Sequence, residues 1–277
     1  MDTAHKAETF RELHRREGAF LIPNPWDVGS ARLLEMAGFK ALATSSAGHA
    51  FSIGKPDNGV GFEAMMRHLA DVASATALPV SADLENGYGD TPEAVVRTVR
   101  AAAEAGVVGG SIEDATGRPD APLYPVEVAA ERIRAAAEAA RSLPFPFTLT
   151  ARAENYLVGQ ADLADTIRRL QAYQEAGADV LFAPGLRSLD DIATLVRSVD
   201  RPVNVIMGIA GVDLTLADLA AAGVKRVSLG GSLARAAYGA LLRATRELQQ
   251  HGSFGYAADA VPMREINEMF RQYPGQR

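Results

Sequence analysis

The chain has 277 residues, of which 48% are hydrophobic and 22% charged, and it carries a formal net charge of −6 and no cysteine. This composition indicates a globular protein with a sizeable core, and the acidic balance argues against nucleic acid or an anionic membrane as the main partner. The absence of cysteine excludes disulfides, thiolate metal sites and cysteine nucleophiles.

Hydropathy along the chain gives no sign of a membrane protein. No apolar run approaches the roughly 20 residues that a membrane-spanning helix needs. The first residues, 1–6, lack the apolar centre of a signal peptide. We therefore expect a cytoplasmic protein.

Short β-prone runs alternate with amphipathic stretches along nearly the whole chain, and no linker or low-complexity segment interrupts them. A helix is predicted first, at 3–16. The predicted strands are 19–23, 41–45, 80–83, 110–113, 148–152, 180–183, 203–207 and 226–229. The predicted helices that follow these strands are 27–37, 62–76, 92–105, 125–141, 160–176, 188–199, 214–222 and 232–250.

Glycine follows four of the predicted helices, in Ala37-Gly38, Ala105-Gly106, Ala176-Gly177 and Ala222-Gly223. A left-handed residue at such a position ends a helix before the next strand, and glycine adopts it at least cost. Eight strand–helix units in about 250 residues fit a (β/α)₈ barrel with the first helix covering its bottom. A doubly wound open sheet is the alternative, but no Gly-x-Gly-x-x-Gly follows the first strand.

We therefore predict one (β/α)₈ barrel domain over 1–277, with 256–277 as a C-terminal extension. Its predicted helix, 262–273, places Met263, Ile266, Met269 and Phe270 on one apolar face. Such a face must pack on its own barrel or on a neighbouring subunit.

Acidic side chains gather where the predicted strands end, which is the end of a barrel that holds active sites. Asp83 and Glu85 lie two residues apart and point the same way in an extended segment. Glu113 ends the next strand, Asp57 lies in the loop after the second strand, and Arg152 ends the fifth. Clustered carboxylates repel one another unless a cation neutralises them, and Mg²⁺ prefers oxygen ligands. The alternative is that these acids are solvated residues at strand ends.

Six motifs, taken together and in order, resemble the isocitrate lyase/phosphoenolpyruvate mutase superfamily over essentially the whole chain. They are Pro23-Asn24-Pro25-Trp26-Asp27, Ser45-Ser46-Ala47, Gly54-Lys55-Pro56-Asp57, Asp83-Leu84-Glu85-Asn86-Gly87-Tyr88-Gly89, Ser111-Ile112-Glu113-Asp114 and Thr150-Ala151-Arg152. The resemblance implies a barrel that binds Mg²⁺, with Mn²⁺ as a substitute ion, and a small 2-oxo acid such as pyruvate, oxaloacetate or 2-oxoglutarate. It also implies stabilisation of an enolate while a C–C or P–C bond is broken or made.

Site roles follow from the same resemblance. Asp83 is similar to the family's direct metal ligand, and Asp57, Glu85 and Glu113 to the acids that hold water around the metal. The resemblance further implies substrate contacts from Trp26, Ser45, Ser46, Ala47, Asp83, Arg152 and Asn155, although Asn155 could equally have a structural role.

The loop after the fourth strand departs from the family pattern. Isocitrate and methylisocitrate lyases carry a cysteine there as proton donor, but 115–124 has neither cysteine nor histidine. We therefore reject isocitrate lyase and methylisocitrate lyase activity by that mechanism. Mutases carry a Lys and an Asn on this loop, and the absence of both here lowers the support for phosphonopyruvate chemistry. The remaining candidates for proton transfer are Tyr88, Arg118, Tyr124 and His49, beside Arg152, and each can instead have a packing or solvent-exposed role.

Several side chains are expected outside the chemistry. His5, His14, His68 and His251 are predicted at the surface, and the far side of the pocket, formed by strands six and seven, should be apolar. Gly230-Gly231 resembles a phosphate cradle, but tight packing is the favoured interpretation.

The sequence thus predicts a Mg²⁺-dependent lyase that cleaves a C–C bond of a 2-oxo or 2-hydroxy carboxylate, by oxaloacetate-type decarboxylation or retro-aldol release. The alternatives are a phosphonopyruvate mutase or hydrolase and a catalytically idle 2-oxo acid binder. We expect a homodimer or homotetramer that exchanges its last helix, because the resemblance implies such exchange.

Overall fold

The structure, a computed structural model, describes residues 2–273, so 274–277 of the predicted extension lie outside the described residues. Eight parallel strands form one sheet in the order β1-β8-β7-β6-β5-β4-β3-β2. The strands are β1 (Phe20–Ile22), β2 (Leu42–Ala43), β3 (Val80–Asp83), β4 (Gly109–Glu113), β5 (Thr148–Arg152), β6 (Val180–Phe182), β7 (Val203–Ile206) and β8 (Arg226–Ser228). The Ala43 N–H donates to the Pro23 carbonyl at 3.1 Å, which links β1 to β2 and nearly closes the barrel.

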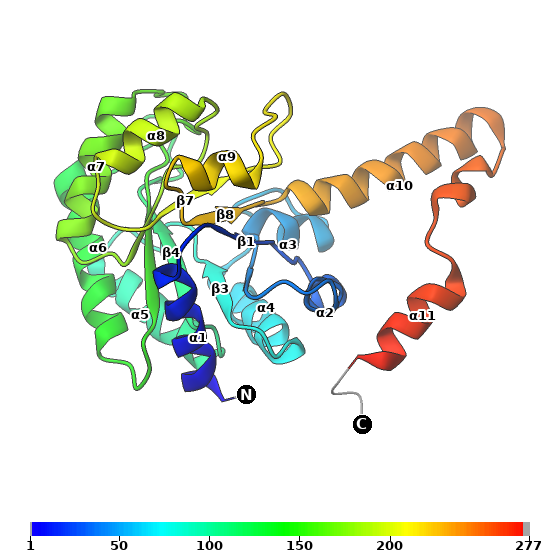
Figure 1. Cartoon of the computed structure of the whole chain (residues 1–277), viewed down its shortest axis with the longest axis horizontal. Helices are drawn as coiled ribbons and strands as arrows, with labels where there is room; N and C mark the ends of the chain where they lie inside the picture. Colours follow the sequence, from blue (N-terminus) through cyan, green and yellow to red (C-terminus); the bar gives the residue numbers. More distant parts are fainter. Residues whose placement is uncertain (1, 274–277) are drawn as a thin grey trace.

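Helices alternate with the strands and surround the sheet (Figure 1). The fold is the predicted (β/α)₈ barrel. The helices are α1 (Thr3–Arg15), α2 (Val28–Met36), α3 (Ser46–Ser52), α4 (Phe62–Ala75), α5 (Pro92–Glu104), α6 (Val126–Arg141), α7 (Leu163–Glu175), α8 (Leu189–Arg197), α9 (Leu216–Ala221), α10 (Ser232–His251) and α11 (Met263–Gln272), with a 3₁₀ helix η1 (Gly255–Asp259).

The predicted elements match the observed ones with small shifts at their ends, but α3 and η1 were not predicted. The segment after β2, expected as a loop, begins with α3 because Ser45 caps it: the Ser45 side chain accepts the Gly48 N–H at 3.1 Å. Gly48 permits close packing here, since a Cβ on it would lie 2.9 Å from the Cβ of Trp26.

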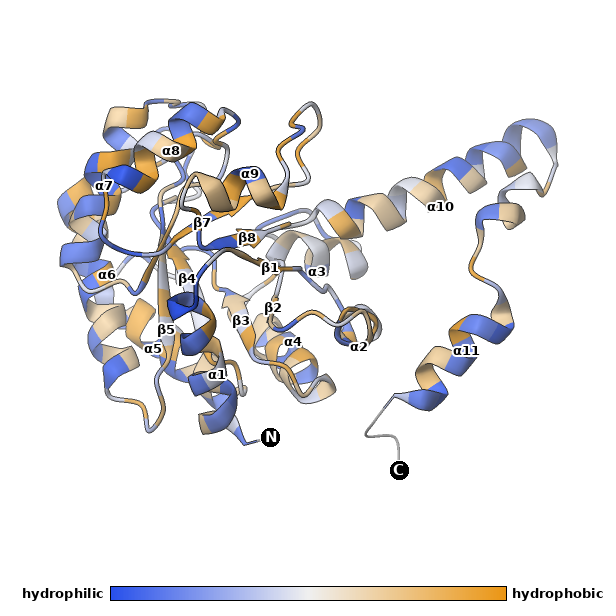
Figure 2. Ribbon diagram, in the orientation of Figure 1, coloured by the Kyte–Doolittle hydropathy of each residue, from blue (hydrophilic) through white to orange (hydrophobic). Residues whose placement is uncertain are grey.

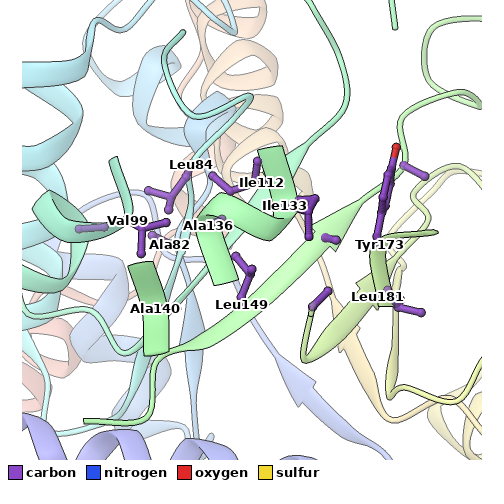
Figure 3. Close-up of a cluster of buried hydrophobic side chains, with 14 of the residues drawn as sticks. Ala82, Leu84, Val99, Ile112, Ile133, Ala136, Ala140, Leu149, Tyr173 and Leu181 are labelled. Atoms are coloured by element: carbon purple, nitrogen blue, oxygen red, sulfur yellow. The ribbon is translucent and has the colours of Figure 1, made fainter. Parts of the chain in front are cut away.

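The main core lies between the sheet and the surrounding helices (Figure 3). Side chains of β3, β4 and β5 meet those of α5 and α6, and each helix turns its apolar face inward (Figure 2). Burial of these apolar side chains is the main stabilising contribution to the fold. Among residues 2–273, no helix is both long and apolar enough to cross a membrane.

The barrel interior is more polar than this outer core. Arg226 on β8 is buried there, donating from Nε to Asn204 Oδ1 at 3.0 Å and from Nη2 to Thr150 Oγ1 at 2.9 Å. Its Nη1 lies 3.3 Å from Nε2 of His14 on α1. Within residues 2–273, Arg226 has no carboxylate at ion-pair distance.

The C-terminal extension leaves the barrel and returns to it. Helix α10 projects away from the barrel, and α11 runs back beside α2 (Figure 1). Tyr273 anchors this return, because its hydroxyl lies 2.5 Å from Glu35 Oε2 and 2.7 Å from the Ala75 carbonyl oxygen. Met263 is 76% exposed and Leu241 56% exposed, so much of the apolar surface of α10 and α11 is uncovered in the single chain (Figure 2).

Candidate active site

A cavity of about 680 Å³ opens at the C-terminal ends of the strands. This is the end of a (β/α)₈ barrel at which active sites form. The predicted site residues that line it are Ser45, Ser46, Ala47, Asp57, Asp83, Glu85, Glu113, Arg118 and Arg152.

Asp83 is held at the end of β3 by the start of α3. Its Oδ2 accepts both the Ser46 hydroxyl, at 2.7 Å, and the Ser46 N–H, at 3.1 Å. The Asp83 N–H donates to Thr44 Oγ1 at 3.0 Å, which fixes the backbone as well. The carboxylate therefore has a fixed orientation toward the cavity.

Arg152, at the end of β5, lies among three carboxylates. Its Nη1 is 3.2 Å from Glu113 Oε2 and 3.7 Å from Asp83 Oδ1, and its Nε donates to Glu154. These carboxylates raise the pKa of Arg152 above its ordinary value against the opposing effect of burial. Three acids around one guanidinium leave an excess of negative charge, which favours a further cation.

Burial, together with neighbouring carboxylates, raises the pKa values of Asp57, Glu85 and Glu113. Burial, followed by the charges of Asp83 and Asp57, raises the pKa of Glu85 to about 8. The Oε1 atom of Glu85 and the hydroxyl of Tyr88 are buried without a hydrogen-bond partner in the described residues. Such unsatisfied oxygen atoms fit a site completed by a cation and its water.

The oxygen-rich residue set therefore fits Mg²⁺. Among residues 2–273, no three Asp, Glu or His side chains are grouped closely enough to coordinate one ion directly. A single direct carboxylate with further acids acting through water is compatible with this spacing.

The turn after β3 is strained and firmly held. Glu85 has a φ of 49° and Tyr88 a φ of 55°, a left-handed conformation that non-glycine residues rarely adopt. Arg132, almost fully buried on α6, donates to the carbonyl oxygens of Asn86 and Gly89. The turn thus keeps Glu85 beside Asp83.

The 115–124 loop lies beside this turn at the cavity mouth. Arg118 forms an ion pair with Asp90 at 2.8 Å, and the Tyr124 hydroxyl donates to the same carboxylate. Gly117 and Pro119 line the cavity together with Arg118, whereas Tyr124 does not line it. Two of the proposed proton donors thus bind Asp90 in this conformation.

Four other predicted site residues lie outside the cavity lining, namely Trp26, Tyr88, Asn155 and His49. Asn155 is fully buried and donates to the carbonyl oxygens of Gln160 and Asp162, which agrees with the structural alternative.

The histidines required a correction. His14 and His68 were predicted at the surface but are 8% and 5% exposed. Both lie on helix faces that pack inward, and the ring of His68 stacks on His49 with centroids 3.7 Å apart. A single histidine in a helical pattern does not reveal which face it occupies.

Sequence reasoning gave no role to three charged residues that line the cavity, Glu154, Arg226 and Arg235. Glu154 pairs with Arg152, and Arg235 lies in the first turn of α10, just after Gly230-Gly231. Arg235 could have been identified from the sequence, because it lies four residues after the glycine pair at the end of a strand. Helix starts near that end of a barrel attract anions. The far wall has the expected apolar residues Phe182 and Ile206, but β7 also contributes the polar Asn204, so this wall is only partly apolar.

Comparison with known proteins agrees with this geometry. The family model for phosphoenolpyruvate phosphomutase matches residues 10–249. The chain belongs to this family. The 2-methylisocitrate lyase of Escherichia coli K12 is 31% identical over 204 residues, covering 71% of this chain and 68% of the relative. The oxaloacetate decarboxylase of Bradyrhizobium diazoefficiens is 29% identical over 233 residues, covering 82% and 78%.

Solved structures show the same relationship. A Burkholderia cenocepacia J2315 protein, whose name gives only the class lyase/mutase, has 62% identity and a TM-score of 0.95, covering 97% of this chain and 96% of that one. Phosphonopyruvate hydrolase with oxalate and Mg²⁺ has 27% identity and a TM-score of 0.85, covering 98% and 95%. Oxaloacetate acetylhydrolase with its product oxalate has 27% identity and a TM-score of 0.84, covering 97% and 94%. The chain is an enzyme of a superfamily whose members act on C–C or P–C bonds.

Proposed function

We propose that the protein is a Mg²⁺-dependent lyase that cleaves a C–C bond of a 2-oxo or 2-hydroxy carboxylate. The observation that carries this proposal is the position of Arg152, buried among Asp83, Glu113 and Glu154 at the strand ends. A cation fixed beside acidic metal-binding groups is suited to a substrate with a carboxylate next to a keto oxygen.

Asp83 would bind the metal directly, and Asp57, Glu85 and Glu113 would hold water around it. When bound, Mg²⁺ would supply positive charge to the carbonyl oxygen on which negative charge develops during bond cleavage. The unpartnered Oε1 of Glu85 supports its part in this set.

The chain's own residues would position the substrate. Arg152 Nη2 makes no hydrogen bond within residues 2–273, so it is free to donate to the carboxylate next to the reacting carbon. Ser46 would orient Asp83 through the two hydrogen bonds already present. Arg235 would bind a second carboxylate at the cavity mouth, which favours a dicarboxylate such as oxaloacetate.

Proton transfer falls to residues near the mouth. Burial raises the pKa of Tyr88, and its side chain lies outside the cavity lining, so both observations weigh against Tyr88 as the proton donor and leave Arg118 and Tyr124 as candidates. Arg118 and Tyr124 would need to release Asp90 before they could serve, and such a movement of the 115–124 loop would also expose or cover the cavity.

A panel of C4 to C7 oxo and hydroxy acids with Mg²⁺ tests the reaction. Release of pyruvate, glyoxylate, oxalate or CO₂, abolished by EDTA and by Asp83→Asn, is the expected result. Consumption of phosphonopyruvate in ³¹P spectra without any of these products would establish P–C chemistry instead, which the family match and the phosphonopyruvate hydrolase relative make the second candidate. Mg²⁺-dependent binding of oxalate without turnover of any substrate would identify an idle 2-oxo acid binder.

We also propose that α10 and α11 join subunits into a homodimer or homotetramer. Leu241, Leu242 and Met263 are more than half exposed in the single chain, and apolar side chains this exposed on two adjoining helices favour association. Exchange of α11 between subunits would cover this surface.

A further inference from the structure

A second cavity, of about 640 Å³, lies at the opposite end of the barrel from the catalytic cavity. It is bounded by α1, by the end of α6 and by the segments that lead into β5, β6 and β7. We call it the basal cavity. None of the proposed catalytic, substrate-binding or metal-binding residues lines it.

The basal cavity is lined by four arginines, Arg11, Arg15, Arg141 and Arg201, and one carboxylate, Asp179. Arg11 and Arg15 are paired with Glu8 and Glu12 on α1, at 2.5 and 2.8 Å, so the excess positive charge lies on Arg141 and Arg201. This contrasts with the chain as a whole, whose net charge is −6. Asp179 accepts the Leu149 N–H at 2.8 Å, and its single negative charge offsets one of the two arginines that lack an ion pair.

Some of these arginines lack ion-pair or hydrogen-bond partners. Arg141 and Arg201 form no ion pair within residues 2–273, and Arg141 makes one long hydrogen bond of 3.4 Å, to the Gly177 carbonyl oxygen. The Nε of Arg11 is buried with no partner in the described residues. Arg11 is nevertheless paired with Glu8 through its Nη2, so Arg141 and Arg201 are the guanidinium groups left to bind an acceptor that the chain does not itself supply.

One side of the basal cavity is apolar, although His14 and Thr148 also line the cavity. Leu143, Pro144, Phe145 and Pro146 form this apolar wall where the chain enters β5. Arginine forks above an apolar wall suit a compact organic anion, because guanidinium groups bind phosphate and carboxylate oxygens in pairs.

We propose that the basal cavity binds a small multivalent oxyanion, either a phosphate ester or a polycarboxylate, at a site separate from the catalytic cavity. The anion lies between Arg141 and Arg201, with its remaining oxygens toward Arg11. Its organic part rests on the apolar wall.

Titration calorimetry with metal-free protein at physiological ionic strength tests this site, with pyrophosphate and tricarballylate as separate probes. Salt at that level screens weak exposed interactions. The variant R141Q/R201Q removes both unpaired arginines. The matched control, R243Q/R246Q, removes two arginines of α10, outside the basal cavity.

The expected result is one probe bound per chain, with affinity lowered about ten-fold or more in R141Q/R201Q, as the loss of charge-assisted hydrogen bonds implies. The control stays within about two-fold. Tighter binding of pyrophosphate indicates a phosphate ester, and tighter binding of tricarballylate indicates a polycarboxylate. The proposal is overturned if no saturable binding occurs, if R141Q/R201Q binds like the natural protein, or if Arg152→Lys rather than R141Q/R201Q removes binding.

Discussion

Ser46 donates both its hydroxyl and its backbone N–H to a single oxygen of Asp83, at 2.7 and 3.1 Å. This pair joins the first turn of α3 to the end of β3. It fixes the orientation of the carboxylate that we propose as the direct metal ligand.

Ser46→Ala removes the hydroxyl but keeps the N–H. We expect Mg²⁺ affinity and kcat/KM to fall about ten-fold, since a hydrogen bond to a charged group contributes roughly 1.5–3 kcal/mol. Metal titration of activity measures both. Ser52→Ala on the same helix is the control, because the exposed Ser52 hydroxyl only donates to the His49 carbonyl oxygen. Equal metal dependence in the two variants would contradict the proposed role.

Arg152→Lys keeps the positive charge but loses the guanidinium fork that spans Glu113 and Glu154. We expect kcat/KM to fall at least about 100-fold, because a lysine cannot hold two carboxylates and a substrate in fixed directions. Steady-state kinetics with the accepted substrate measures this. Arg187→Lys, at an exposed arginine outside the catalytic cavity, should be nearly neutral. Activity of Arg152→Lys within about three-fold of the natural protein would exclude a substrate-binding role.

Arg235→Gln tests substrate length. If Arg235 binds a second carboxylate, KM for a dicarboxylate should rise about ten-fold or more while binding of the monocarboxylate pyruvate stays unchanged. Kinetics with the dicarboxylate and competition by pyruvate separate the two. Arg243→Gln, further along α10, is the matched control. Equal effects on both ligands would remove Arg235 from specificity.

Acid should destabilise the protein through its buried histidines. Burial, followed by the charge of His49, lowers the pKa of His68 to about 3. The unfolded chain binds this proton near pH 6.5, so the contribution to stability is complete above that pH and is lost as the pH falls toward 3. Each such histidine lowers the free energy of unfolding by about 1.4 kcal/mol per pH unit in this range.

Urea unfolding at several pH values between 5 and 8 measures this slope. His68→Met should reduce it by one proton, and His251→Met, at an exposed position, should not. Burial and the charge of Arg226 also lower the pKa of His14 to about 3. Because His14 is present in both variants, part of the dependence of the unfolding free energy on pH remains in each. An unchanged slope in His68→Met would contradict the assignment.

Charge on the apolar surface of α10 should weaken association. Leu241→Asp places a carboxylate where we propose subunit contact, so sedimentation should show smaller assemblies. Gln249→Asp, at an exposed polar position of α10, is the control. Identical sedimentation of Leu241→Asp and the natural protein would argue against this interface.

The sequence predicted the barrel because its local patterns and the global fold agree: short β-prone runs alternate with amphipathic stretches, and glycine ends four helices before the next strand. The helix α3 was expected as a loop, although Ser45 caps it, because the seven-residue segment is short and Gly48 must pack closely against Trp26 for the helix to form there. Short helices of this kind depend on tertiary contacts more than on propensity.

The sequence indicated which residues of the candidate site end neighbouring strands, but not which of its side chains contact one another. Asp83, Glu113 and Arg152 end adjacent strands, so their convergence followed from parallel pairing. Tyr124 and Arg118 could not be placed in the same way, because their attachment to Asp90 depends on how the 115–124 loop folds. The polar contacts of Arg226 likewise come from β5, β7 and α1, which are distant in sequence.

Arg226 gives the barrel an internal electrostatic polarity. Burial lowers its pKa only to about 9, so it remains a cation at neutral pH beneath the acidic strand ends. The positive charge of Arg226 lies inside the barrel, below the carboxylates at the strand ends. This arrangement orients an anionic molecule with its charged group pointing along the barrel axis. Such a field selects the orientation of a ligand before any single contact forms, and its range extends beyond the side chains that touch the ligand.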